Sequence, residues 1–176
     1  PEPLYYKFNE QENEIFIETI RLLVSEFKYS RYQPLTYYEG EREERERQSQ
    51  RNIAKFMKIL MVKRLESSFH AFRLTINRFI QSYERVIDEF QNGNVYISKK
   101  YINKIFEALE EDNHEAIERL LEEDKAEKLR AEDFRSDFFS DLKSDFKILH
   151  KVQELWANIG HDPKWEAFRE VLNSQP

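Results

Sequence analysis

The 52 residues from 41 to 92 contain neither glycine nor proline. The two residue types that most readily interrupt a helix are therefore missing from a long, continuous part of the chain. One straight helix over this window would extend at least roughly 70 Å at 1.5 Å per residue, which is longer than a compact domain of 176 residues. The segment must protrude, or break and fold back as a hairpin. The sequence leaves open whether it is one helix or two.

Apolar residues within this window fall at helical spacing in two sets. The first set is Ile53, Phe56 and Leu60, and the second is Val62, Leu65, Phe69, Phe72, Ile76, Phe79, Tyr83, Val86 and Phe90. The second set alternates steps of three and four residues, which is a heptad-like pattern. At 100° per residue the two sets lie roughly 140° apart around one helix. The apolar face therefore changes near residues 61–65, where we expect a break or a change of packing partner. The charged run 41–47 that precedes these sets is typical of a solvated or disordered helix start.

Further helices are predicted on both sides of this window. Asn9 and Glu12 have the spacing of a capping box and start a helix from about 10 to 28. Weaker patterns predict helices at about 98–111 and 112–121, whereas 122–133 is charged and weakly patterned. Asp162 and Pro163 form an N-cap and first-turn proline for a last helix.

A long helix is predicted from 134 to 159, and alternation at Leu4, Tyr6 and Phe8 predicts a short extended entry at the N-terminus. The residues of the long helix expected to point inward are Phe139, Leu142, Phe146, Leu149, Val152, Trp156 and Ile159. The expected fold is all-α: an elongated helical bundle with one or two long helices and a short extended N-terminal segment.

Composition excludes several classes of function. The chain has no cysteine, so disulfides, Cys-based zinc sites and iron–sulfur clusters are excluded. Its three glycines lie far apart, and neither GxxxxGK[ST] nor GxGxxG occurs, so no phosphate-binding loop is predicted. The four histidines lack the HxxxH and HExxH spacings, and we predict neither a metal site nor catalytic residues. No apolar run approaches the roughly 20 residues of a membrane span, and no signal peptide opens the chain.

Charge is distributed in blocks that the net value of −6 conceals. Residues 51–104 carry a net +7, whereas residues 105–141 carry a net −9. Basic side chains on a rigid helix can bind a phosphate backbone without reading sequence. The candidates for nucleic-acid backbone contact are Arg51, Lys55, Lys58, Lys63, Arg64, Arg73 and Arg78. On an ideal helix Arg51, Lys55, Lys58 and Arg73 project close together on one side. The alternative interpretation is an ordinary charged face, or one that pairs with the acidic block.

The segment 58–72, KILMVKRLESSFHAF, resembles a helix that Snf-type superfamily II helicases of the bacterial HepA/RapA-like branch carry between their two RecA-like lobes. Other segments resemble that branch in the same order along the chain. They are 3–8 followed by the helix through 14–20, SRYQPL at 30–35, DLKSD at 141–145, and DPK at 162–164 with Phe168 and Leu172. The resemblance covers nearly the whole chain, and its KRLESS element is the most specific part.

The resemblance implies a domain division and a function. Residues 1–161 would form a helical insertion or linker domain, and 162–176 the first helix of the second lobe. The structural motif residues would be Leu65, Glu66, Ser67, Ser68 and Phe72. The chain would be a non-catalytic segment of an ATP-dependent DNA translocase, with ATP and Mg²⁺ bound elsewhere in the parent protein and no cofactor of its own.

The same resemblance implies the partners, which are double-stranded DNA and the flanking lobes, with no membrane, and a bacterial cytoplasmic, nucleoid-associated location. The isolated chain is expected to be inactive as an ATP hydrolase. A different class of function remains open: a stand-alone helical protein-interaction or scaffold module that acts, and self-associates, through its aromatic stripe.

Overall fold

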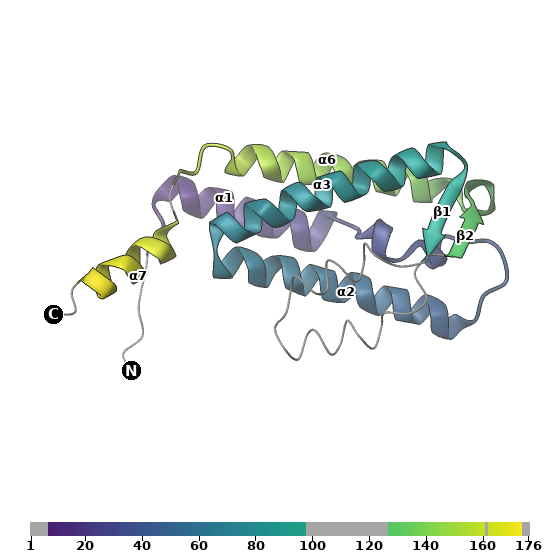
Figure 1. Cartoon of the computed structure of the whole chain (residues 1–176), viewed down its shortest axis with the longest axis horizontal. Coiled ribbons are helices and arrows are strands. Elements are labelled where there is room, and N and C mark those ends of the chain that lie inside the picture. Colours follow the sequence, from purple (N-terminus) through teal and green to yellow (C-terminus); the bar gives the residue numbers. More distant parts are fainter. Residues whose placement is uncertain (1–6, 98–126, 161, 174–176) are drawn as a thin grey trace.

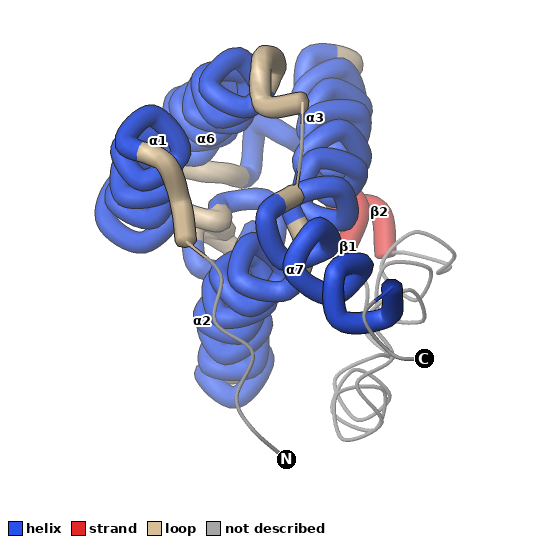
Figure 2. The backbone as a smooth tube through the Cα atoms, turned by 90° about the vertical axis from the view of Figure 1, so that its left-hand side faces the viewer, coloured by secondary structure: helices blue, strands red, loops and turns tan. Residues whose placement is uncertain are grey.

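The computed structural model describes residues 7–97, 127–160 and 162–173, and these form a predominantly helical bundle (Figure 1). The predicted all-α fold class is confirmed. Four long helices run alternately in opposite directions, and a view along the bundle shows them around a common core (Figure 2). They are α1 (Glu10–Arg21), α2 (Glu44–Ser67), α3 (Phe69–Gln91) and α6 (Ser136–Trp156), and a shorter α7 (Pro163–Asn173) follows.

The window without glycine or proline folds as a hairpin of two helices, α2 and α3, which answers the question that the sequence left open. The break lies at Ser68, which has extended backbone angles (φ −160°, ψ 130°). Its Oγ accepts a hydrogen bond from Ala71 N (3.3 Å), so Ser68 is the N-cap of α3. The change of apolar face therefore takes place a few residues after the position expected at 61–65.

The local signals at the starts of α1 and α7 are confirmed. Asn9 Oδ1 accepts from Glu12 N, and Glu12 Oε2 accepts from Asn9 N, each at 2.8 Å, which completes the capping box. α1 continues into a π-helical turn at Leu22–Glu26. At α7, Asp162 Oδ1 accepts from Trp165 N (3.3 Å), and Pro163 is the first helical residue. The extended entry expected at residues 4–8 lies mostly outside the described residues, as do the helices expected at 98–111 and 112–121.

A two-stranded antiparallel sheet joins β1 (Asn94–Ile97) and β2 (Glu127–Arg130) at one end of the bundle. In its register Asn94 pairs with Arg130 and Ile97 with Glu127. The strand β2 was not predicted, because residues 122–133 lack an alternating apolar pattern. Its side chains are exposed or half-buried, and its pairing depends on a strand 30 residues away in sequence.

The core combines buried residues of α2, α3 and α6 with those of the segment between α1 and α2. The second apolar set predicted in the sequence supplies Phe69, Phe72, Ile76, Phe79 and Tyr83, all buried. In α6 the inward positions Leu142, Leu149, Val152 and Trp156 are buried as predicted, and so is Ile159 after its end.

Two inward positions of α6, Phe139 and Phe146, differ from the prediction because both are only half-buried. The predicted Phe139 is only half-buried, whereas its neighbour Phe138 is fully buried. Phe138 contacts the rings of Tyr37 and Phe134, with ring centroids 4.9 and 5.2 Å away, and those rings come from the preceding loops. These rings outside the helix therefore set the rotation of the first turn of α6. Within the described residues, no helix is both long and apolar enough to cross a bilayer.

Candidate nucleic-acid interface

Four basic side chains lie around one groove of about 370 Å³ on the surface of α2 and the loop that precedes it. Arg51, Lys55 and Lys58 come from successive turns of α2, at spacings of four and three that place them on one helix face. Lys28 joins them from the segment after α1. The groove therefore combines three candidates from the basic block with one lysine outside it.

The four cations differ in how far neighbouring groups neutralise them. Lys28 Nζ forms an ion pair with Asp141 Oδ1 (2.6 Å), which raises the pKa of the lysine. Arg51 forms an ion pair with the exposed Glu44. Lys58 Nζ donates to the carbonyl of Val24 (2.7 Å), which leaves its charge unneutralised.

Lys55 is exposed and forms no ion pair with the residues that the structure describes. Lys55 and Lys58 therefore provide the net positive charge of the groove.

The aromatic residues that line the groove are buried in the core beneath it. Phe27, Tyr29 and Tyr37 retain 3, 1 and 7% of their surface. Burial raises the pKa of both tyrosine hydroxyls. Because single-stranded nucleic acids are held by exposed rings on which bases stack, these rings cannot play that part. The groove can attract an anionic backbone, but it offers no stacking surface for bases.

One buried carboxylate, that of Asp145 on α6, holds the groove wall in place. Its Oδ1 accepts from Lys28 N (2.7 Å), and its Oδ2 accepts from Ser30 N (2.9 Å), Ser30 Oγ (2.7 Å) and Tyr83 Oη (3.0 Å). Burial raises the pKa of Asp145, and these donors partly oppose the rise. The family resemblance singled out the segments that carry Ser30 and Asp145, but neither charge nor periodicity distinguishes Asp145 from a surface acid.

The remaining basic candidates lie away from the groove. Arg73 was expected to project with Arg51, Lys55 and Lys58, but the break at Ser68 puts it on α3, where it donates to Ile159 O (2.7 Å). Arg64 Nε donates to Thr75 Oγ1 (3.3 Å). Lys63 near the end of α2 and Arg78 on α3 are exposed. The structure thus brings together three of the seven candidates.

The segments that carry the family resemblance meet in pairs. Ser30 of SRYQPL binds Asp145 of DLKSD, as described above. Ser68 Oγ and Phe69 N both donate to Asp162 Oδ2, at 3.0 and 2.9 Å, which joins KRLESSF to DPK.

The other motif residues of KRLESSF divide between core and surface. Leu65 and Phe72 are buried, and Glu66 and Ser67 are exposed. Ser68 is half-buried and makes the contact to Asp162 described above.

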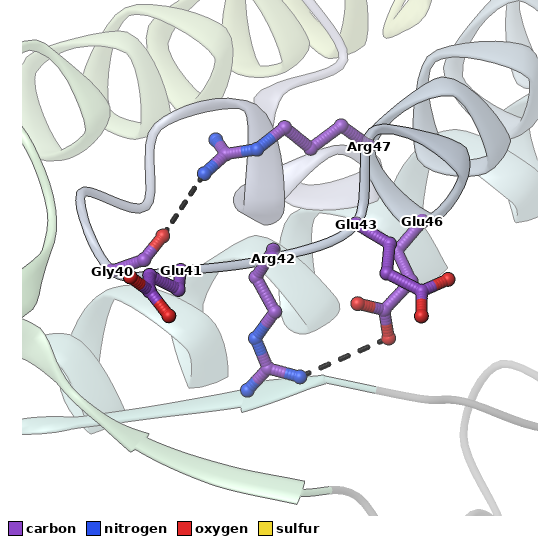
Figure 3. Close-up of a pocket in the computed structure, with 6 residues that line it drawn as sticks. All are labelled: Gly40, Glu41, Arg42, Glu43, Glu46 and Arg47. Carbon is purple, nitrogen blue, oxygen red and sulfur yellow. Dashed lines mark hydrogen bonds and ion pairs between the residues drawn. The ribbon is translucent and has the colours of Figure 1, made fainter.

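A second, larger recess of about 850 Å³ lies at the start of α2, where the charged run 41–47 begins (Figure 3). Arg47 reaches back to the carbonyls of Leu35 (2.6 Å), Tyr38 (3.0 Å) and Gly40 (3.1 Å). Arg42 points the other way, toward Glu46 (3.8 Å; Figure 3). It also pairs with Glu127 of β2 (2.5 Å).

The prediction of a solvated or disordered helix start is therefore wrong for Arg42 and Arg47, because both side chains hold the loop before α2 against the rest of the fold. A Cβ at Gly40 would lie 2.4 Å from the ring of Tyr38, so a side chain there would have to displace that ring. We interpret this recess as structural.

No group of three or more His, Cys, Asp or Glu side chains that could hold a metal ion occurs among the described residues. His70 is exposed on α3, and the ring of His150 packs edge-on against Phe146 (4.6 Å between centroids). His114 and His161 lie outside the part of the chain that the structure describes.

Comparison of the chain with protein-family models, with curated proteins and with solved structures found no match.

Proposed function

We propose that this chain is a non-catalytic helical segment of a Snf-type superfamily II ATP-dependent DNA translocase, which links the two RecA-like lobes and contacts the DNA backbone. The observation that carries the DNA contact is the groove at Arg51, Lys55 and Lys58. It gathers cations on one rigid helix face and leaves at least two of them unneutralised. Because its aromatic rings are buried, it would bind phosphates without regard to base identity.

Two features of the architecture support the linking role. The start of α1 and the whole of α7 lie at the same end of the bundle, so the chain enters and leaves together, as an inserted domain requires (Figure 1). The pairing of KRLESSF with DPK through Asp162 also fixes α7 against the hairpin of α2 and α3. In the proposed parent protein, α7 would continue into the second lobe and transmit its position to the helical bundle.

The DNA contact can be tested by fluorescence anisotropy with a labelled duplex of random sequence at a series of salt concentrations. Two to three neutralised phosphates predict weak binding whose logarithmic salt slope is about −2 to −3. The double variant Lys55→Gln/Lys58→Gln should lower that slope by about 2. The matched control Lys128→Gln/Lys147→Gln removes the same charge from exposed positions that do not line the groove. Equal losses in both variants, or no binding at low salt, would remove the DNA contact from the proposal.

A scaffold or interaction module remains the second candidate. The aromatic stripe through which we expected it to act is wrong as a contact surface, because Phe69, Phe72 and Phe79 are buried in the core. The contact surface would instead lie on α7, which exposes large apolar side chains. Trp165, Phe168 and Leu172 retain 58, 47 and 53% of their surface. Contiguous exposed apolar side chains mark contact surfaces. Sedimentation velocity over a concentration series, with the variant Trp165→Ser/Phe168→Ser as comparison, tests this candidate. Self-association that the variant abolishes, together with absent DNA binding, would favour it.

A further inference from the structure

Another cavity, separate from the basic groove and from the recess at the start of α2, lies between α3 and α6 and has a volume of about 190 Å³. Its floor consists of the buried side chains of Ile76, Val152 and Trp156. Polar side chains from both helices form its rim, where Gln153 Nε2 donates to Asn77 Oδ1 (2.8 Å). The cavity is therefore apolar inside and polar at its mouth, which is the usual make-up of a small-molecule site.

The indole of Trp156 is fixed in place, so it cannot rotate to fill this cavity. Its Nε1 donates to Thr19 Oγ1 (2.8 Å), which is completely buried on α1. The rings of Phe69 and Phe72 pack edge-on against it, with centroids 4.5 and 5.7 Å away. A floor held from several sides keeps its shape when the cavity is empty. The site is therefore largely formed before any ligand binds.

The volume limits what the cavity can hold. Drug-sized ligands occupy pockets of about 300–1,000 Å³, whereas a dry apolar cavity of about 150 Å³ suffices for a single benzene ring. A cavity of about 190 Å³ thus suits one aromatic ring or one branched aliphatic group. A nucleotide, with a base, a sugar and phosphates, is too large.

Arg73 gives the cavity its charge. It lies on the rim, half-buried, and its Nη1 donates to the backbone carbonyl of Ile159 (2.7 Å). That bond anchors the guanidinium but uses only one of its five N–H groups, and a planar guanidinium can bind a carboxylate through two of the others. We propose that this cavity binds a small apolar carboxylic acid, with the ring or branched chain against Trp156 and the carboxylate on Arg73.

The proposal is independent of DNA binding, because Arg73 lies on α3 and the basic groove is built on α2. It also accounts for an arginine that the sequence grouped with the nucleic-acid contacts and that the structure places elsewhere. A peptide that ends in leucine or phenylalanine presents the same two groups, an apolar side chain and a free carboxylate. The experiment therefore compares a free acid with such a peptide.

The test uses the full chain with Trp165→Phe, which leaves Trp156 as the single tryptophan. Its fluorescence is followed during titration with 3-phenylpropionate and with the neutral 3-phenylpropionamide. We expect a saturable change with the acid and at least about tenfold weaker binding of the amide, because the amide lacks the charge-assisted bond. A tetrapeptide ending in phenylalanine, with a free or an amidated C-terminus, shows whether the natural source is a small acid or a chain terminus, according to which binds more tightly.

Two variants and one control make the test specific. Arg73→Gln should remove the preference for the acid over the amide, and Ala157→Phe, at an exposed position on the rim, should block both ligands. Arg78→Gln removes an exposed arginine from the same helix without touching the cavity, and it should bind like the parent. Circular dichroism checks that each variant is folded. The proposal is overturned if acid and amide bind equally, if no saturable signal appears by about 10 mM, or if Ala157→Phe still binds.

Discussion

Replacing the buried carboxylate of Asp145 should destabilise the bundle more than replacing any exposed acid. Its two oxygens accept four hydrogen bonds, which come from the backbone N–H groups of Lys28 and Ser30, from Ser30 Oγ and from Tyr83 Oη. Both Ser30 and Tyr83 are completely buried. The donor groups of these two residues therefore cannot bind water when the carboxylate is removed. A buried donor without a hydrogen-bond partner costs about 1–3 kcal/mol.

Two substitutions of Asp145 should lower the free energy of unfolding by different amounts. Asp145→Ala leaves the donors of Ser30 and Tyr83 unpaired, and we expect a loss of about 4 kcal/mol in the free energy of unfolding. Asp145→Asn keeps one oxygen. Placed at the position of Oδ2, that oxygen can still accept three of the four bonds, while its amide group faces the N–H of Lys28. The expected loss is about 2 kcal/mol. The exposed control Asp137→Asn should change stability by less than about 0.5 kcal/mol.

Urea denaturation followed by circular dichroism at a series of pH values measures these differences. Burial raises the pKa of Asp145 above its ordinary value of 3.8. The folded protein then binds more protons than the unfolded chain between these two pKa values, so this group contributes stability at low pH that is lost as the pH rises through its folded pKa. The advantage of the parent over Asp145→Asn should therefore shrink as the pH rises from about 3. A loss below about 1 kcal/mol for Asp145→Ala, or an advantage that grows with pH, would refute this account.

Three further predictions concern the contacts that hold the ends of the fold. Asp162→Ala should uncap α7 and free the N–H of Phe69, so that hydrogen–deuterium exchange of α7 amides rises while that of α6 is unchanged. Arg47→Ala should lower the free energy of unfolding by about 2–3 kcal/mol, measured by urea denaturation, because three backbone carbonyls lose their donor. Arg21 and a lysine of α6 lower the pKa of Glu18 to about 2; the stability difference between the parent and Glu18→Gln, present at neutral pH, should disappear in urea titrations as the pH falls from 4.5 towards 2.

The sequence predicted those parts of the fold that depend on neighbours within one helical turn. The capping box of Asn9 and Glu12, and the N-cap of Asp162 before Pro163, are confirmed because donor and acceptor lie three residues apart. The break at Ser68 was harder to locate. Serine is a good N-cap, but it also occurs within helices, and here the break is stabilised by Asp162, which is 94 residues away in sequence.

The parts that sequence reasoning missed depend on contacts between distant segments. In α6 we predicted that Phe139 is buried, but its neighbour Phe138 is buried instead. Contacts with aromatic side chains of the loops, rather than helical periodicity, decide which of the two rings is covered. Lys28 was overlooked as a groove residue because it lies outside the basic block. Asp145 ends the DLKSD segment of the family resemblance, but neither its spacing nor its charge separates it from exposed acids. Only the fold reveals that it receives four hydrogen bonds.

Charge blocks along a sequence describe an interface poorly, because pairing occurs between segments and not within blocks. The acidic segment 105–141 does neutralise one groove cation, since Asp141 binds Lys28, and Glu127 binds Arg42 at the start of α2. Lys55 and Lys58 escape this pairing because they lie on the middle turns of α2, where the neighbouring element offers backbone carbonyls such as that of Val24. A carbonyl can hold a lysine in position without cancelling its charge, and such a lysine remains able to attract a phosphate. The proposed contact to DNA should therefore depend on these two residues more than on the net +7 of the block to which they belong.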